Sequence, residues 1–402
     1  SHKNFEPRFG FAYSVSPSLV VRGAYGISFY GGQFDNINIL QLNPPTAGSL
    51  TISNPTGPTS TNPTNDAPIA TIETPVPAAL YPSTPFFNAT TLPADRKHPD
   101  LYLQTYNLAI SKQFWSNVID VTYVGVKGTH LDSSLTYSNS PQPGAGPIQQ
   151  RRPYPNFARI RMLDFSGASN YNALQVHFEH RMSHGLSFTA AYSFSHTLDN
   201  QGADTNNGGC ECQNPLVIHE WANSLNDQRH NLTVGYVWNL PTLKQSNRVV
   251  RGVVNGWRLN GIAQVASGTP LFITQAQDSQ NTDNSWQRPN LVPGVNPKLS
   301  DRSVNGWFNA AAFTPSILSY GNTPRNPLVG PSTRNTNLAV ARTFTMPFAE
   351  THSLELRLES FNTLNTPQFA NPGIALGNGD FGKITSTKID NRELQLGVKY
   401  LF

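Results

Sequence analysis

Hydrophobic residues recur at every second position through much of the chain. Between residues 186 and 194, Leu186, Phe188 and Tyr192 share one side, and the residues between them are small or carry hydroxyl groups. This period of two is typical of a β-strand with one apolar face. The same alternation marks residues 9–13, 19–29, 106–111, 119–123, 174–179, 257–265 and 354–359. About 12 to 14 such segments, most of them roughly 9 to 11 residues long, predict an all-β protein with almost no helix.

The connections between these segments alternate in length. Short links lie at 15–18, 114–117 and 182–185, whereas long polar stretches occupy approximately 31–100, 131–156, 197–228 and 272–335. Loops of that length argue against a compact soluble sandwich. Short turns at one end and long loops at the other are typical of an antiparallel transmembrane β-barrel. We therefore interpret residues 1–402 as a single β-barrel domain with long extracellular loops, not as several domains joined by linkers.

The C-terminal segment 392–402 has the most specific pattern. Its apolar residues occupy every second place, at Leu394, Leu396, Val398, Tyr400 and Phe402. The terminal edge strand of any β protein would show such alternation. The aromatic last residue favours the closing strand of a barrel, with a terminal ring in the interfacial aromatic belt. On this interpretation Gly397, Val398, Tyr400 and Phe402 form a barrel-closing and insertion signal, similar to the one by which the barrel assembly machinery recognises outer-membrane proteins.

Composition narrows the class of protein further. Charged residues make up 13% of the chain and aromatic residues 10%, with a formal net charge of +4. The charged fraction is about half that of an ordinary soluble domain. Basic residues group only as Arg151-Arg152 and as the loose set Lys244, Arg248 and Arg251. A nucleic-acid partner is therefore not expected, because it would require a concentrated basic face.

Few residues suggest specific chemistry. Cys210 and Cys212 are a candidate loop disulfide or an inert loop pair, and too few further ligands lie nearby for a metal site. Glu355, Arg357 and Glu359 form a charged row on one strand face, which we interpret as a solvated lumen face or as a contact surface for a plug or substrate. No catalytic motif is recognisable. We expect no enzyme activity, cofactor or resident metal.

Several long segments resemble a known family. They include NFEPRFGFAYSVSPSLVVRGAYGISFY, TYNLAISKQFWSNVIDVTYVGVKGTHL, SNYNALQVHFEHRMSHGLSFTAAYSFSHTLDN and LRLESFNTLNTPQFANPG. Together they are similar to the barrel of TonB-dependent outer-membrane receptors of the Oar-like type, which carry a carboxypeptidase-regulatory-like domain ahead of the plug. The family closes 22 strands around an N-terminal plug and imports ligands with energy from TonB. This resemblance implies a location in the bacterial cell outer membrane.

The sequence departs from that family in showing no plug domain and too few strands for the whole barrel. We therefore expect the C-terminal part of a 22-stranded barrel, completed by a plug and further strands from the same precursor. Outer-membrane lipid, the barrel assembly machinery and, through the plug, the TonB complex would be its partners. The leading hypothesis is a transport barrel whose external loops bind a ligand. The alternatives are a surface structural or self-assembling protein derived from such a barrel, and a soluble carbohydrate-binding β protein.

Overall fold

The main body of the protein is one antiparallel sheet of 12 strands. The computed structural model describes residues 4–30, 99–200, 212–214, 220–245, 247–284, 286–346 and 352–402. The strands are β1 (Arg8–Ser16), β2 (Leu19–Tyr30), β3 (Leu101–Phe114), β4 (Asn117–Tyr137), β5 (Arg161–Ser183), β6 (Leu186–Asp199), β7 (Ala222–Asn223), β8 (His230–Asn239), β9 (Trp257–Ala266), β15 (Thr333–Thr345), β16 (Ser353–Phe361) and β20 (Glu393–Leu401). Apart from β7, which pairs with β6, they follow one another across the sheet in chain order. The prediction of an all-β antiparallel fold is confirmed, and the 12 strands of the main sheet lie at the lower end of the predicted 12 to 14.

One face of the sheet is apolar and exposed. In β16, Leu356 and Leu358 are 39% and 48% exposed, whereas the neighbouring Glu355 side chain is only 16% exposed. The register carries this face across the sheet, since Leu356 lies opposite Val398 of β20 and Leu358 lies opposite Val340 of β15. A soluble protein would place these side chains in its core. Apolar residues outward and polar residues inward are the arrangement of a sheet surrounded by lipid.

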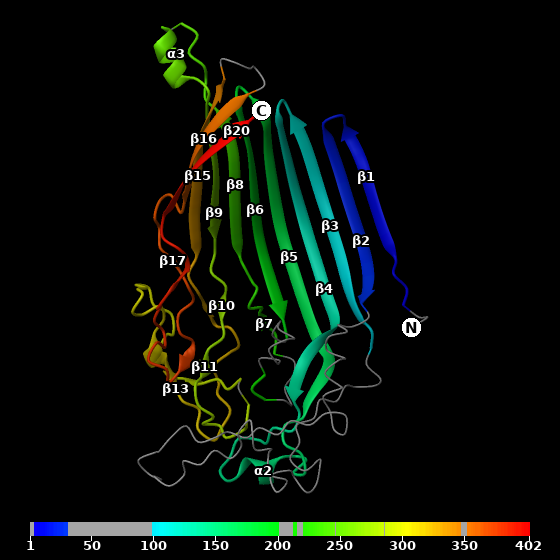
Figure 1. The fold of residues 1–402 in the computed structure, drawn as a ribbon. Coiled ribbons are helices and arrows are strands. Elements are labelled where there is room, and N and C mark those ends of the chain that lie inside the picture. The colour runs from blue at the N-terminus through cyan, green and yellow to red at the C-terminus, as the bar shows by residue number, and fades with distance from the viewer. Residues whose placement is uncertain are drawn as a thin grey trace, which may run out of the picture.

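Glycines on this face allow aromatic rings from neighbouring strands to lie flat against the sheet. The ring of Tyr106 on β3 covers Gly125 on β4, and the ring of Tyr236 on β8 covers Gly261 on β9. A Cβ atom at Gly125 would lie 2.1 Å from the Tyr106 ring, and one at Gly261 would lie 2.6 Å from the Tyr236 ring. Such pairs fix the register and favour the curvature that Figure 1 shows across the sheet.

The two ends of the sheet differ. At one end the strands are joined by tight turns, including 115–116 and 184–185, where Trp115, His184 and Gly185 adopt positive φ angles. The longer β8–β9 connection at this end contains the short helix α3 (Arg248–Val254), which projects beyond the strands (Figure 1). Aromatic side chains gather near this end, on the apolar face and in the turns: Phe114, Trp115, Phe178, Phe188, Trp238, Trp257, Phe344, Tyr400 and Phe402. This distribution is typical of an interfacial aromatic belt.

The opposite end carries the long connections. They contain helix α2 (Ile148–Arg151), the 3-10 turn η3 (Ala310–Ala312) and short strand pairs. These strands are β10 (Pro270–Leu271), β11 (Thr274–Gln275), β12 (Asn290–Leu291), β13 (Phe313–Thr314), β14 (Leu328–Val329), β17 (Gln368–Phe369), β18 (Ala375–Leu376) and β19 (Thr387–Ile389). No helix in the described part of the chain is long and apolar enough to span a membrane.

The strand ends extend further than the sequence predicts. β4 continues to Tyr137 and β6 to Asp199, so both enter stretches that we expected to be loop. β15 begins at Thr333, within the expected 272–335 loop, and a further long connection at 362–392 was not anticipated. The alternation fades in these strand ends because polar residues occupy both faces, as in TRNTN at the start of β15. Period two therefore marks only the part of each strand that has one apolar face.

The sheet has two open edges among the described residues. β1 pairs only with β2, and β20 pairs only with β16. Figure 1 shows these two strands at opposite margins of a curved sheet that does not close. Their backbone N–H and C=O groups require further partners, because unpaired edges are not tolerated in lipid and promote association in water.

Candidate functional site

The long connections fold together into a compact body, which we call the loop lobe. It comprises the described parts of residues 138–160, 200–229, 267–332 and 362–392. Its hydrophobic core consists of Leu271, Ile273, Phe308, Ala312, Phe313, Leu328 and Phe381. The three phenylalanine rings meet edge to face, with centroids 5.1 to 5.7 Å apart. The lobe therefore has a core of the kind found in soluble proteins, which the sheet itself lacks.

Backbone pairing connects distant parts of the lobe. β11 pairs in parallel with β18, so Thr274 lies opposite Ala375, about a hundred residues further along the chain. The pairs β10–β14, β12–β13 and β17–β19 are antiparallel. The main-chain nitrogen of Trp307 donates to the carbonyl of Gly382 at 2.8 Å. These bonds hold the β9–β15 and β16–β20 connections in one unit.

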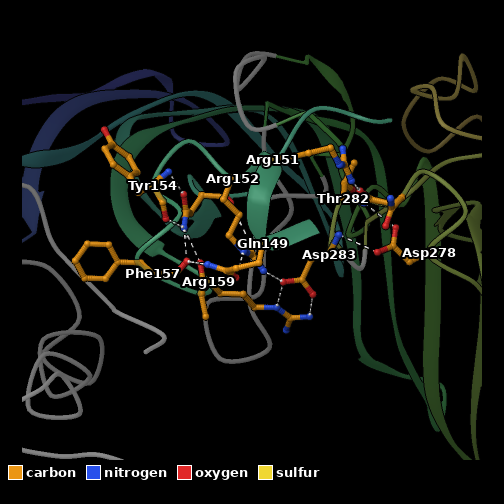
Figure 2. Close-up of polar contacts among 12 residues, drawn as sticks. Gln149, Arg151, Arg152, Tyr154, Phe157, Arg159, Asp278, Thr282 and Asp283 are labelled. Carbon is orange, nitrogen blue, oxygen red and sulfur yellow. Dashed lines mark hydrogen bonds and ion pairs between the residues drawn. The ribbon is translucent and has the colours of Figure 1, made fainter. Parts of the chain in front are cut away.

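An ion-pair cluster joins the β4–β5 connection to the β9–β15 connection (Figure 2). Arg159 donates to both carboxylate oxygens of Asp283, at 2.9 and 2.5 Å, and Arg152 donates to the same carboxylate at 2.5 Å. The Arg152 side chain is only 5% exposed. Burial by itself would raise the pKa of Asp283, but the hydrogen bonds and charges of the two arginines outweigh it and hold the pKa below its ordinary value. The carboxylate is therefore charged at neutral pH.

Asp278 organises the turn that presents this carboxylate. It accepts hydrogen bonds from the main-chain nitrogens of Thr282 at 2.9 Å and Asp283 at 2.8 Å, and a further bond from the Gln287 side chain. Asp283 has a φ of +58°, in the left-handed region. The Arg151 guanidinium meets the same turn by donating to the carbonyl of Asn281 at 2.5 Å. Figure 2 shows these side chains converging from the two connections.

A second set of arginines ties the β9–β15 connection to the β6–β8 connection within the lobe. Arg288, with a side chain 3% exposed, donates to both oxygens of Glu220 at 2.7 Å. Arg325 forms an ion pair with Asp199 at the end of β6 and donates to the Glu220 carbonyl at 2.8 Å. Burial lowers the pKa of Arg325 to about 10, so the guanidinium stays charged at neutral pH. Buried arginines that donate to carboxylates and carbonyls fix the orientation of the lobe on the strand ends.

Buried amides fill the space between these ion pairs. Gln280 and Gln287 are 0% and 1% exposed. The Gln280 amide donates to the hydroxyl of Ser316 at 2.8 Å, and the Gln287 carbonyl oxygen accepts from Gln275 at 3.0 Å. Gln213 of the β6–β8 connection joins this network by donating to the carbonyl of Gly321 at 2.6 Å. A buried polar network with so many partners favours one arrangement of the connections.

Two cavities open beside the ion pairs. One has a volume of about 250 Å³ and is lined by Arg159, Gln275, Ala276, Gln277, Asp278, Asp283, Asn284 and Gln287. The other has a volume of about 320 Å³ and is lined by Ser138, Ser140, Gln142, Pro143, Gly144, Arg151 and Pro153. The first cavity is lined by amide, carboxylate and guanidinium groups, which suits a polar ligand with several hydroxyl or amide groups, whereas the lining of the second is mainly apolar. The described residues contain no cluster of three metal-ligating side chains.

The charged row expected on β16 is present as a connected set of side chains. Arg357 lies 3.6 Å from Glu355 and 3.3 Å from Glu359. Glu355 also accepts from Arg258 of β9 at 3.0 Å, across the intervening β15. These residues lie on the polar face, and no recorded hydrogen bond or ion pair of their side chains joins them to the described part of the loop lobe. The row and the lobe are therefore separate features.

The expected C-terminal signal lies at the turn end of β20. Gly397 lies opposite Arg357 on the polar face, whereas Val398 and Tyr400 lie on the apolar face and are 65% and 45% exposed. Tyr400 hydrogen-bonds to His352 at 2.6 Å and stacks against Phe402. Recognition of these residues by an assembly machinery stays a prediction. The candidate disulfide also stays a prediction, because Cys210 lies outside the described residues, while Cys212 is buried and its carbonyl accepts from Asn284 at 3.0 Å.

Comparison with known proteins identifies the family. The sequence model of the outer membrane beta barrel domain matches residues 1–395. The chain belongs to this family. The exposed apolar face is thus the lipid-facing surface of an outer membrane β-barrel domain, and the outer membrane is where the domain resides. A search of curated protein sequences found no match.

Solved structures of longer outer membrane proteins align with this chain. The outer membrane transporter YddB from Escherichia coli aligns with a TM-score of 0.52 and 10% identity, over 99% of this chain and 40% of that protein. The ferripyoverdine receptor of Pseudomonas aeruginosa aligns with a TM-score of 0.47 and 8% identity, over 99% of this chain and 33% of that one. The FrpB iron transporter from Neisseria meningitidis gives 0.45 and 8%, over 98% and 38%. The outer membrane β-barrel domain described here therefore spans between about a third and two fifths of these proteins.

The loop lobe contains the residues that sequence reasoning missed. Arg152 was noted only as part of a basic pair, and Arg159, Asp278 and Asp283 were not singled out. The weak signal that was available is Arg151-Arg152 in a chain with few charges, together with the turn-forming sequence around Asp278. Neither feature indicates which distant loop supplies the partner.

Proposed function

We propose that this domain is the barrel portion of a TonB-dependent outer-membrane receptor of the Oar-like type. In this proposal the loop lobe faces the outside of the cell and binds the ligand, and the polar face of the sheet lines the lumen. A plug and further strands from the same precursor complete the barrel and couple it to TonB. The domain carries out transport and no catalysis. Its C-terminal residues Gly397, Val398, Tyr400 and Phe402 are read by the barrel assembly machinery.

The observation that carries this proposal is the loop lobe itself. Ion pairs and buried amides fold the connections into a body with its own hydrophobic core and two cavities, one of them lined mainly by polar groups. A barrel that served only as a membrane anchor has no need of such an ordered polar surface at one end. Transporters and receptors are also the proteins whose solved barrels align with this chain, which supports the same function by analogy. On this basis Glu355, Arg357 and Glu359 form a charged row on the lumen wall.

The lining of the cavities narrows the class of ligand. Arg159 and Asp283 neutralise one another, and the other polar groups of that wall are mainly amides of Gln and Asn. Such a surface favours an uncharged or zwitterionic molecule with several hydrogen-bonding groups, such as an oligosaccharide or a short peptide.

The transport proposal is tested without knowledge of the ligand. The full-length protein in lipid nanodiscs, which leave both faces of the barrel accessible, is incubated with the purified periplasmic domain of TonB from the same cell, and co-purification is measured. We expect saturable binding that is lost when the residues preceding this chain in the gene product are deleted. Absence of binding by the full-length protein would refute TonB-dependent transport.

The open edges of the sheet favour a second candidate, a self-assembling surface protein. β1 and β20 would then pair between copies instead of with strands of the same precursor. Cysteines introduced as Ala12→Cys on β1 and Gly397→Cys on β20 test this alternative in a chain with Cys210 and Cys212 replaced by Ser. A disulfide-linked ladder on a non-reducing gel of outer membranes supports assembly. A single monomer band supports the receptor.

A further inference from the structure

The connection between β8 and β9 has no role in the proposed transport. Residues 240–256 contain Lys244, Arg248 and Arg251 and no acidic residue. They include helix α3, which projects at the turn end of the sheet, opposite the loop lobe (Figure 1). Its three basic residues and no acidic residue give the segment a formal charge of +3. It marks this connection as a candidate surface for an anionic partner.

Helix α3 also exposes an apolar stripe. Val249 is 74% and Val253 is 60% exposed, and Val250 and Val254 are partly exposed beside them. The spacing of four residues within each pair places these side chains along one side of the helix. Nothing else in the described chain covers them. This short helix combines an exposed valine stripe with basic residues in the same segment. Such a composition is typical of an element that lies in a membrane interface.

The helix is held on the lipid side of the sheet. Arg342 of β15 donates to the carbonyls of Val253, at 2.9 Å, and of Gly252, and the indole nitrogen of Trp257 donates to the Val253 carbonyl at 2.9 Å. Arg342 lies opposite both Trp257 and Leu356 in the register, so all three belong to the apolar face. The valine stripe therefore continues the surface that already contacts lipid.

Side-chain hydrogen bonds stabilise the rest of the β8–β9 connection. Asn255 accepts from the main-chain nitrogen of Leu243 at 2.8 Å and donates to its carbonyl at 3.1 Å. Asn247 caps the helix by accepting from the nitrogen of Val250 at 2.8 Å. Arg342, which is bonded to helix α3, places its guanidinium 4.3 Å from the centroid of the Phe344 ring. This cation–π contact holds the Arg342 side chain within the aromatic belt. These bonds hold the connection in one shape at the edge of the bilayer.

We propose that residues 240–256 form an interfacial element that binds anionic phospholipids. The valine stripe enters the acyl region next to the sheet, while Lys244 and Arg251 contact the lipid phosphates. Two observations carry this assignment: the exposed stripe belongs to a helix that is bonded to Arg342 and Trp257 of the lipid-facing surface, and the basic charge complements an anionic headgroup. The choice of phospholipid over lipopolysaccharide rests on the proposed orientation, in which the short turns face the periplasm.

Lipid selectivity provides the first test. The full-length protein is reconstituted in nanodiscs of phosphatidylcholine with a minor fraction of phosphatidylglycerol, and the phosphatidylglycerol retained after detergent extraction is counted by native mass spectrometry. The double variant K244Q/R251Q should retain it roughly 30-fold more weakly, because each basic residue near an anionic surface contributes about a factor of five. The matched variant K298Q/R302Q in the loop lobe should behave as the wild type. Equal retention by both variants would overturn the proposal.

The depth of the helix provides a second test, which does not depend on charge. A nitroxide at position 249, introduced by Val249→Cys with Cys210 and Cys212 replaced by Ser, is compared with one at position 245. We expect the label at 249 to collide more with oxygen than with a water-soluble nickel chelate, and the label at 245 to show the reverse. A water-accessible label at 249 would contradict the proposal. A label at 249 that is protected from water only in whole cells would also contradict the proposal, because a protein would then cover the helix.

The two proposals fail in different experiments. Loss of TonB binding with intact phosphatidylglycerol retention would refute the transport function and support the lipid element. Retention of lipopolysaccharide in place of phosphatidylglycerol would overturn the phospholipid assignment together with the proposed orientation.

Discussion

The aromatic core of the loop lobe allows a sharp test of whether the lobe is an independent folding unit. Phe308 is 3% exposed, and its ring meets those of Phe313 and Phe381 at centroid distances of 5.7 and 5.1 Å. Phe308→Ala removes both ring pairs and leaves a cavity. A buried Phe→Ala change costs about 3–5 kcal/mol, of which each ring pair contributes about 0.5–1.5 kcal/mol. We expect the lobe to open locally while the sheet, which has no share in this core, stays folded.

Hydrogen exchange of the detergent-purified full-length protein measures this effect. The amides of Thr274, Ala276 and Trp307 donate across the lobe to the carbonyls of Ile374, Leu376 and Gly382. In Phe308→Ala they should exchange at least about a hundredfold faster, since every 1.4 kcal/mol corresponds to a factor of ten.

An exposed position of the loop lobe provides the control. Ile317→Ala, at a position 67% exposed, should change exchange little, because surface substitutions usually stay within about 0.5 kcal/mol. Unchanged exchange in Phe308→Ala would show that the core does not hold the lobe together. Equal acceleration in β4, β5 and β6 would show that lobe and sheet unfold as one unit.

Three further predictions concern the cluster, the lipid face and the C-terminus. Asp283→Asn should weaken docking of the 138–160 connection by about 2–3 kcal/mol at pH 7, measured by protease sensitivity, because it leaves the buried Arg152 without a charged partner. The arginines hold the pKa of Asp283 below its ordinary value. The ion pair therefore contributes its full stability above the unfolded pKa of about 4, and this contribution is lost as the pH falls through the folded pKa. The Asp283→Asn variant should lack this sensitivity to acid. Leu356→Arg on the apolar face should destabilise the inserted protein by about 2–4 kcal/mol in urea titrations. Gln395→Arg on the polar face should be tolerated, and equal effects of the two changes would contradict the assignment of the faces. Deletion of Phe402 should slow the appearance of the folded form in a pulse-chase of outer membranes, and an unchanged rate would count against the insertion signal.

The sheet was predictable from sequence because one physical constraint acts on every strand. Lipid on one side and polar surroundings on the other force a period of two, and residues 186–194 of β6 and 394–400 of β20 show it. The turn positions followed from the same pattern. The N-terminal half of β15 was not predicted, because its polar residues occupy both faces and leave no period to detect.

The candidate site was much less predictable. The loop lobe depends on pairs such as Arg152–Asp283 and Asp199–Arg325, whose members are 131 and 126 residues apart. Local composition shows that these stretches are polar and rich in turn-forming residues. It does not show which arginine meets which carboxylate, because that choice depends on how the strands bring their ends together. The charged row on β16 was visible in advance because its members lie two residues apart on one strand.

The ion pairs between connections have a consequence for engineering this protein. Arg152 and Arg159 belong to the β4–β5 connection, and their partner Asp283 belongs to the β9–β15 connection. Arg325 of the β9–β15 connection pairs with Asp199 at the end of β6, where the β6–β8 connection begins. A chimera that received a single connection from another protein would leave buried arginines unmatched on the host side. Changes of specificity by loop exchange would therefore succeed only when the joined connections are transplanted as a set, and natural diversification of this surface is subject to the same constraint.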